Sequence, residues 1–290
     1  MSHFCVLVVG EDPESQLSKF DENIVMPRYV SYTKEQLITK KRNELEDYKN
    51  GTYAEFLKDP VKYKSECSNK AHINYLENEF PKKLNWTDEE VYLDAIEFEE
   101  KEDIGKDGEI YSTYNPNSKW DWYQLGGRYT GRLILKDNTK GELGEISLLA
   151  TDEYKKEHAN WKKSGVRADQ ARKKDIDFDK MLQDRIYTAK EEYAKFKKEY
   201  IIAKSDSDRK NICFMYDIEP ETTEEEYLKD IVAFSAFAVL KNGEWFERGK
   251  MGGWGMVKDE KENDVWQKEF DKLIKDLPEN TLLSIYDCHI

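Results

Sequence analysis

The chain has few cysteines and none of the spacings that make cysteine informative. Four are scattered along it, and none forms a Cys-x-x-Cys pair: Cys5, Cys67, Cys213 and Cys288. This spacing offers no sequence-local zinc site, and a disulfide framework is not expected in a reducing compartment. The Asp-x-Asp-x-Asp-Gly pattern of a calcium loop is also missing. We therefore expect no bound metal and no cofactor.

Long apolar runs are missing as well. No stretch of about 18 apolar residues occurs, and the first residues lack the basic region of a secretory signal peptide. These two absences predict a protein without membrane spans that works in the cytoplasm.

The common catalytic signatures do not occur. Gly126-Gly127-Arg128 lacks the spacing and the lysine of a phosphate loop, and neither Gly-x-Ser-x-Gly nor His-Glu-x-x-His is found. We name no catalytic residue and favour a binding protein over an enzyme. An enzyme would need a general base, for which His289 and Asp121 are the candidates.

Basic side chains are fewer than acidic ones. The sequence has 60 acidic side chains against 46 Lys and Arg, which gives a formal net charge of −14. Because binding along a phosphate backbone needs a basic surface, we do not expect direct nucleic-acid binding. The acidic balance fits a protein that meets a basic partner, and it fits ordinary solubility equally well.

What the sequence does contain is aromatic side chains and strand patterns at both ends. Aromatics make up 13%, which predicts a packed core despite the high charge. Residues 3–9 are continuously apolar, as in a strand buried on both faces. Residues 233–240, the hairpin turn Asn242-Gly243 and residues 282–286 predict further strands. We expect an α+β protein with one mixed or antiparallel sheet built from both chain ends and the centre.

Two polar segments interrupt this pattern. Residues 31–107 are acidic and mostly helical, with capping boxes that begin at Thr33 and Thr87. Residues 176–231 contain a long amphipathic helix. The predicted organisation is an α+β core of residues 1–30, 108–175 and 232–290 with helical insertions at 31–107 and 176–231.

The densest group of informative residues lies between Tyr114 and Leu135. Tryptophan faces stack on bases, arginine forks onto carboxylate or phosphate, and glycine lets an anion approach the backbone. This predicts a binding cleft or, alternatively, a packed corner in which Asp121 bonds an indole N–H or pairs with Arg128. The candidate binding residues, which include one from a second glycine-rich aromatic turn, are Trp120, Asp121, Trp122, Tyr123, Arg128, Arg132 and Trp254.

Local patterns add three expectations. Residues 119–123 alternate, which favours a strand with Trp120 and Trp122 on one side and Tyr123 on the other. Residues 129–135 predict another strand. The basic segment 165–174 predicts either a site for an acidic partner or the entry to the next helix, with local ion pairs.

The two chain ends carry histidine and cysteine that pairing of the first and last strands would bring together. They are His3, Cys5, Cys288 and His289. One interpretation is a metal site, or a Cys–His nucleophile oriented by Asp287. The alternative is that these side chains simply alternate between core and solvent.

Several longer words resemble a family of phage and prophage proteins. They are Met-Ser-His-Phe at the start, Lys119-Trp120-Asp121-Trp122-Tyr123 and Gly126-Gly127-Arg128 in the centre, Ala168-Asp169-Gln170-Ala171-Arg172-Lys173 and Asp175-Ile176-Asp177-Phe178 after it, and Asp287-Cys288-His289-Ile290 at the end. The chain has Tyr129 where the family usually has Trp, and Cys5 where it usually has Thr. The second departure weakens a catalytic role for Cys5.

The resemblance implies an accessory protein of a phage. Acidic phage proteins of this size without an enzyme motif are often counter-defence factors, and the anti-Gabija proteins are similar in length and source. By this analogy we expect a homo-oligomer in the host cytoplasm. It would act as a Gabija inhibitor does, by binding and blocking a host defence complex. The alternatives are a sponge or hydrolase for a nucleotide signal, with its pocket at the Trp and Arg residues, and a structural or virion protein.

Overall fold

The computed structural model of the chain describes residues 2–229, 231–252 and 256–290. They form two compact units: unit 1 comprises Met1–Asn23 and Pro116–Ile290, and unit 2 comprises Ile24–Asn115. Helices and a mixed sheet occur together, which confirms the predicted α+β class. The segment 176–231, predicted as an insertion, belongs to unit 1. No helix of the described residues combines the length and the apolarity needed to cross a bilayer.

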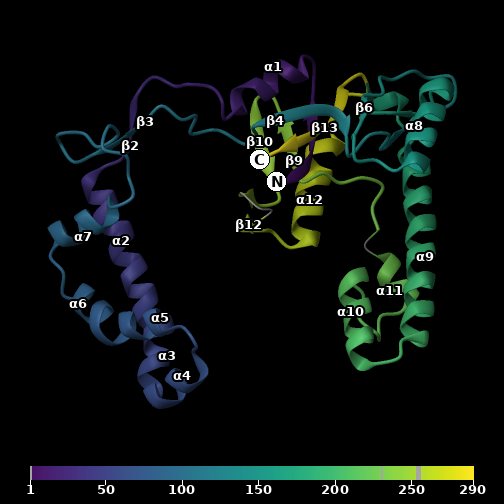
Figure 1. Cartoon of the computed structure of the whole chain (residues 1–290). Coiled ribbons are helices and arrows are strands. Elements are labelled where there is room, and N and C mark those ends of the chain that lie inside the picture. Colours follow the sequence, from purple (N-terminus) through teal and green to yellow (C-terminus); the bar gives the residue numbers. More distant parts are fainter. Residues whose placement is uncertain (1, 230, 253–255) are drawn as a thin grey trace. The chain divides into compact units, whose positions relative to one another are not determined.

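Both chain ends and the centre contribute strands to the sheet of unit 1, as predicted (Figure 1). At its middle, β1 (His3–Val9) and β13 (Leu282–His289) pair antiparallel, with His3 opposite His289. The central strand β4 (Trp122–Gly127) pairs antiparallel with the same end of β13. This register brings residues from three distant parts of the sequence to one end of the sheet.

The remaining strands extend this sheet on both sides. β9 (Ala238–Lys241) runs parallel to β1, and β10 (Glu244–Glu247) returns beside it through the predicted Asn242-Gly243 turn. Both turn residues have positive φ, 56° and 77°, as this hairpin type requires. β6 (Glu145–Ile146) runs parallel to β4, and β8 (Gln170–Arg172) pairs with the start of β13.

The sheet is buried on both faces, which explains the continuous apolar run of β1. Because side chains alternate along a strand, Phe4, Val6 and Val8 enter one core cluster, while Leu7 and Val9 enter the other. Helix α12 (Asn263–Lys275) supplies Trp266 and Phe270 to the second cluster. The indole of Trp266 donates to the carbonyl of Ala236 at 2.8 Å.

Helices of unit 1 border this core. α8 (Asp152–Ser164) begins at Thr151, whose hydroxyl accepts the N–H of Tyr154. The long α9 (Phe178–Ile202) carries α10 (Asp206–Tyr216) and α11 (Glu224–Lys229) against its C-terminal half (Figure 1). Phe196 of α9 is fully buried there. The smaller elements are α1 (Pro13–Leu17), β5 (Leu133–Ile134), β7 (Arg167–Ala168), β11 (Lys250–Met251) and β12 (Val257–Lys258).

Unit 2 is mostly helical and is closed by one strand pair, β2 (Tyr29–Tyr32) with β3 (Ile110–Ser112). The two predicted capping boxes are confirmed, at the starts of α2 (Lys34–Tyr48) and α7 (Asp88–Ala95). Asp94 of α7 forms an ion pair with Lys41 of α2 (2.8 Å) and another with Lys83 (2.7 Å), which precedes α7 in the chain. The other helices are α3 (Ala54–Lys58), α4 (Pro60–Glu66), α5 (Lys70–Asn74) and α6 (Phe80–Lys83).

Two local predictions were wrong, and a third holds in part. Trp120 and Tyr123 share one core cluster with their ring centroids 4.7 Å apart, because Trp120 precedes β4 in a bridge to Asp21 and breaks the alternation. The strand predicted over residues 129–135 is limited to β5, since a tight loop occupies its first half. The basic segment 165–174 forms β7 and β8 and then leads through a 3-10 turn, Lys173–Asp175, into α9, so the helix entry is present. Its ion pairs reach Glu11, Asp184 and Glu279 and are not local.

Candidate functional site

A tight loop at residues 126–132 connects the end of β4 to β5. Three of its glycines have positive φ: Gly126 (77°), Gly127 (56°) and Gly131 (75°). A Cβ on Gly127 would lie 2.5 Å from the Cβ of Asp287, and one on Gly131 would lie 2.6 Å from the ring of Trp161. Glycine is therefore required here by the backbone conformation and by the packing together.

The buried carboxylate of Asp169 holds one side of this loop. It accepts hydrogen bonds from the Thr130 hydroxyl (2.7 Å), the N–H of Gly131 (2.6 Å) and the N–H of Gly144 (2.8 Å). Burial raises the pKa of Asp169, and the three donors oppose that rise. With its lone pairs occupied by these groups, Asp169 fixes the path of the backbone.

The buried carboxylate of Asp287 holds the other side. Its Oδ2 accepts the N–H of Arg128 at 2.9 Å, and its Oδ1 lies 2.9 Å from Nδ1 of His3. The hydroxyl of Tyr129 donates to the carbonyl of His3 at 3.1 Å. The loop is thus anchored to β13 and β1, and its exposed Arg128 and Arg132 side chains start from a fixed backbone.

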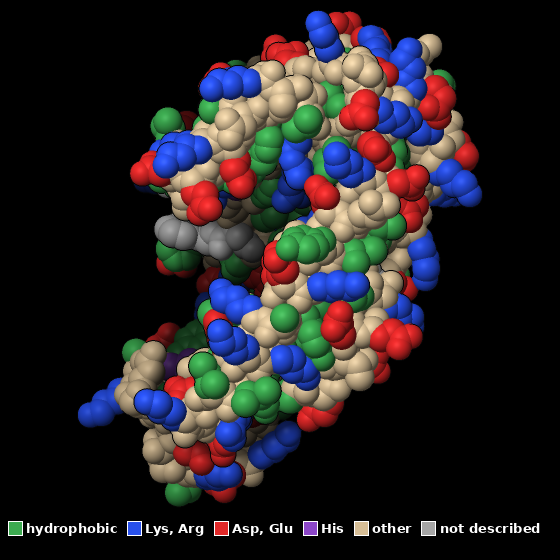
Figure 2. All heavy atoms as spheres, turned by 90° about the vertical axis from the view of Figure 1, so that its right-hand side faces the viewer, with side chains coloured by type: hydrophobic (Ala, Val, Ile, Leu, Met, Phe, Trp, Pro, Cys, Tyr) green, Lys and Arg blue, Asp and Glu red, His purple; other side chains and the backbone are tan. Residues whose placement is uncertain are grey.

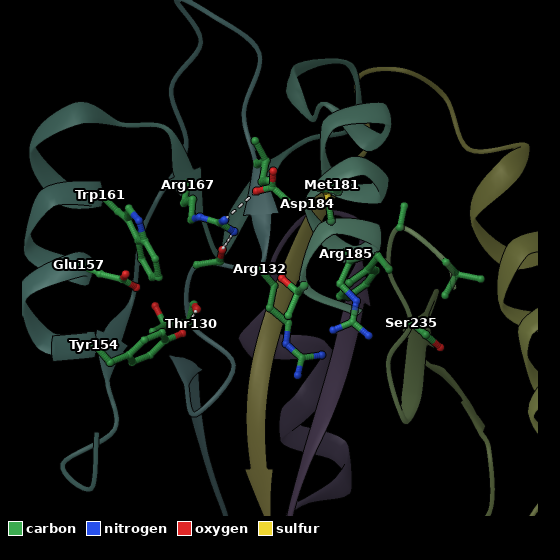
Figure 3. Close-up of a pocket in the computed structure, with 16 residues that line it drawn as sticks. Thr130, Arg132, Tyr154, Glu157, Trp161, Arg167, Met181, Asp184, Arg185 and Ser235 are labelled. Carbon is green, nitrogen blue, oxygen red and sulfur yellow. Dashed lines mark hydrogen bonds and ion pairs between the residues drawn. The ribbon is translucent and has the colours of Figure 1, made fainter. Parts of the chain in front are cut away.

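A cavity of about 520 Å³ lies beside this loop (Figure 3). Its walls come from α8, which carries Tyr154 and Trp161, from α9, which carries Arg185, and from residues 232–235. This volume lies within the usual range of small-molecule sites. Its charged lining residues are Arg132, Arg167, Arg185, Glu157 and Asp184.

The guanidinium of Arg167 already binds other groups of the cavity wall. Its guanidinium donates to the carbonyl of Gly131 and to the carboxylate of Asp184, both at 3.0 Å. It also lies over the ring of Trp161, 5.0 Å from the centroid. Arg167 therefore ties the loop, α8 and α9 together, and it has little capacity left for a ligand.

Arg132 and Arg185 are in a different situation. Within the described part of the chain, neither forms an ion pair; Arg132 lies over the ring of Tyr129, 4.7 Å from the centroid. In Figure 3 their guanidinium groups extend in the same direction. Because Asp184 is paired with Arg167, Glu157 is the cavity acid left to balance two arginines.

The surrounding surface carries no large field of one charge. Figure 2 shows Lys and Arg interspersed with Asp and Glu on the side of the molecule that α8 and α9 form. Binding along a nucleic-acid backbone relies on an extended basic field, whereas a small anion needs only a few local donors. Arg132 and Arg185 provide a few local donors, as a site for a small anion does.

The structure scatters the binding residues predicted from the sequence. Trp120 is buried in the core, with Tyr123 against it. Trp122 is 46% exposed at the end of the sheet that bears His3. Arg132 lines the cavity, and Trp254 lies outside the described residues.

Asp121 follows neither of the pairings predicted for it. Its Oδ1 lies 2.5 Å from Nδ1 of His289, so it serves an imidazole and not an indole or Arg128. The indole N–H of Trp120 is buried and has no acceptor within the described ranges of the chain. Arg128 uses its backbone N–H on Asp287 and leaves its side chain exposed.

The chain ends converge, but without a reactive thiol. His3 and His289 are in edge contact, with ring centroids 4.9 Å apart. Cys288 lies next to His289 in the strand and so points to the other face of the sheet, into the core cluster that contains Phe4 and Val6. Burial raises the pKa of Cys288 well above the ordinary value. Burial also raises the pKa of Cys5 to about 12. The Cys–His nucleophile is therefore wrong, and no group of three metal-ligating side chains occurs among the described residues.

The sequence did not single out most of the cavity residues. Tyr154, Trp161 and Arg185 were not among the candidate residues, and Arg167 was noted only as part of a basic segment. One signal was available: Tyr154 and Trp161 are seven residues apart, on one face of a helix that follows the glycine loop. Their meeting with Arg185 depends on tertiary packing.

Comparisons with known proteins give no further assignment. No family model, no curated protein and no solved structure matches this chain.

Proposed function

We propose that the cavity beside loop 126–132 binds a small ligand that joins an anionic group to a ring, as a nucleotide does. The observation that carries this proposal is the pair Arg132 and Arg185, two arginines without an ion pair in the described structure that line one cavity. Arginine binds phosphate or carboxylate through two parallel N–H donors.

The charge of the whole chain strengthens this interpretation. The protein as a whole carries a formal net charge of −14. At this cavity the balance is reversed, because Arg132 and Arg185 line it together with Glu157 as the acid left without an ion pair in the described structure. An anionic ligand supplies the missing countercharge, and the partly enclosed wall strengthens that attraction relative to water.

The ring of the ligand has an aromatic wall to contact. Tyr154 and Trp161 pack edge to face, with ring centroids 5.5 Å apart, and Tyr154 is fixed by donating to the carbonyl of Thr130 at 2.9 Å. Aromatic contact with a nucleobase contributes about 1–3 kcal/mol per base. The nucleotide-binding alternative predicted from the sequence is thereby retained, with Arg132 as the residue common to both versions of the pocket.

A thermal-shift screen with ATP, GTP and cyclic mono- and dinucleotides tests the proposal. At about 100 times the dissociation constant, a bound nucleotide should raise the melting temperature by about 5 °C. Arg132→Gln and Arg185→Gln should each weaken that nucleotide by about 10- to 100-fold. Arg209→Gln, on the surface of α10, is the matched control and should bind like the wild type. If no nucleotide gives a shift, or if both variants bind normally, the cavity has another role.

A second candidate is the counter-defence role, and one observation favours a protein-binding surface. The end of α9 exposes Ile201 (75%) and Ile202 (67%), and the last turn of α10 exposes Phe214 (90%) and Met215 (65%). Large apolar side chains that are exposed to solvent are typical of protein interfaces where they form one patch. A homo-oligomer that covers a defence complex in the host cytoplasm would use such a surface.

Plating of phage on hosts with different defence systems tests this second candidate. The gene should raise plating efficiency on one defended host, and Phe214→Ser should abolish that gain while the protein keeps its melting temperature. Phe98→Ser in unit 2, where the side chain is 92% exposed, is the control and should keep the gain. A gene that changes plating on none of the hosts has no counter-defence role against them.

A further inference from the structure

A histidine that is paired with a buried carboxylate lines a second, smaller cavity next to the first. This cavity has a volume of about 290 Å³, and its wall includes His3, Tyr129, Arg132 and Arg248. His3 and the buried Asp287 lie on paired strands and meet at 2.9 Å. None of the roles proposed above uses this pair.

The pair has the geometry of an activated base. Asp287 is 1% exposed and is held from its other oxygen by the N–H of Arg128, so its carboxylate cannot turn away from His3. An ionised carboxylate accepts a proton-bearing Nδ1, which leaves Nε2 of the neutral ring with its lone pair. A buried carboxylate that orients an imidazole in this way is a recurring element of hydrolytic sites.

The imidazole of His289 restricts the position of the His3 ring. His289 packs against His3 edge to face and is itself held by Asp121 at 2.5 Å. Trp122 covers another side of His3, with ring centroids 6.2 Å apart. Because Nε2 of His289 is buried, His289 restricts the ring of His3 and does not itself face the cavity.

The cavity also contains groups suited to an anion. Arg248 forms an ion pair with Glu260 through one terminal nitrogen, while its buried Nε has no partner among the residues that the structure describes. Such an unsatisfied donor is uncommon in folded proteins, and an acceptor on a ligand would satisfy it after a small shift of the side chain. Arg132 and Ser235 line both cavities, so a phosphate held by Arg132 borders the space in front of His3.

We infer that the smaller cavity is a hydrolytic site in which His3 acts as the general base for cleavage of a phosphate ester in the bound ligand. This inference rests on the proposed function, because Arg132 must hold the phosphate. The ring end of the ligand occupies the larger cavity and the ester bond faces His3.

The step is a hydrolysis at phosphorus. Nε2 of His3 takes a proton from a water molecule as the water oxygen forms a bond to phosphorus. The bond between phosphorus and the leaving oxygen breaks, and that oxygen takes a proton from solvent. Arg132 and Arg248 offset the charge that develops on the phosphoryl oxygens. His3 then returns its proton to solvent, so the overall reaction consumes one water.

The other nucleophiles near this cavity do not fit the role. Burial raises the pKa of the Cys5 thiol to about 12, so it is protonated at neutral pH. Burial likewise raises the pKa of Tyr129 to about 12, and its hydroxyl already donates to the backbone of His3. Attack by a water molecule activated by His3 is the reaction that remains.

The test combines binding with turnover on the full chain. The substrates are bis(p-nitrophenyl) phosphate, p-nitrophenyl phosphate and the nucleotide that gives the largest thermal shift. His3→Asn keeps an N–H donor for Asp287 but removes the basic nitrogen. It should lower kcat by about 100-fold or more while KM and nucleotide binding stay nearly unchanged. His72→Gln, in unit 2, is the matched control and should retain full activity.

Each outcome decides between the two proposals. Nucleotide binding without hydrolysis of any substrate overturns the hydrolytic site and leaves the binding function intact. Absence of binding by every nucleotide overturns both. Hydrolysis that persists in His3→Asn removes His3 as the base. His3→Gln is the second variant should His3→Asn fail to fold, and the diester and monoester substrates show which ester class is cleaved.

Discussion

At the scale of single residues, two buried carboxylates fix the position of the loop that borders the site. Asp169 and Asp287 each accept a backbone N–H from the loop at residues 126–132, and the loop glycines leave no room for a side chain against them. The sequence showed the glycines and suggested that an anionic group approaches the backbone there; the structure has this approach and, in addition, a positive φ at these glycines. The sequence did not show that the approaching groups are carboxylates, because these lie 38 or more residues away from the loop N–H groups that they accept.

The cysteines allow a prediction at this same scale. Cys5 and Cys288 are buried and their pKa values are raised by burial, whereas Cys67 and Cys213 are partly exposed. Since only the thiolate reacts rapidly, a thiol reagent such as Ellman's reagent should modify two of the four cysteines of the native protein at pH 8. All four should react in urea.

The variants Cys67→Ser and Cys213→Ser identify the reactive pair. Each should remove one fast-reacting thiol. Fast reaction of all four cysteines in the native protein would show that the sheet opens readily and would contradict the burial of β1 and β13.

At the scale of elements, sequence patterns predicted helix starts and turns correctly where neighbouring residues alone determine the structure. The capping boxes at Thr33 and Thr87 and the Asn242-Gly243 hairpin formed as predicted, because each depends on residues within one turn. The alternation at residues 119–123 failed, because a bridge from Asp21 to Trp120 determines where β4 begins. That contact spans the chain and leaves no local pattern.

The pairing of α2 with α7 yields a pH-dependent prediction. Burial raises the pKa of Asp94, but its bonds with Lys41 and Lys83 outweigh that and lower the pKa below the ordinary 3.8. An acid with a lowered folded-state pKa contributes stability above its unfolded pKa, and loses it as pH falls through the folded value. At pH 7, Asp94→Asn should destabilise unit 2 by about 1 kcal/mol.

Hydrogen exchange of the α2 and α7 amides measures this effect. At pH 7 the variant should lose about fivefold in protection, and the loss should shrink below about pH 4 as Asp94 of the wild type takes up its proton. Asp47→Asn, an exposed acid in the last turn of α2, is the control and should change protection little. An equal loss of protection at both pH values would mean that packing, not charge, causes it.

At the scale of the whole molecule, the predicted joining of both chain ends and the centre in one sheet is confirmed. This could be read from the sequence because apolar runs at each end have no partner unless they pair. The cavity could not be read in this way. Arg132 and Arg185 come from a loop and from the long helix α9, and only the packing of α9 beside β5 brings them to one wall.

A crystal structure of the protein with the nucleotide that gives the largest thermal shift tests the central claim most directly. The account predicts the nucleotide in the cavity of about 520 Å³, with its phosphate bonded to Arg132 and Arg185 and its ring against Tyr154 or Trp161. A nucleotide bound elsewhere, with both arginines making no contact to it, would contradict the account.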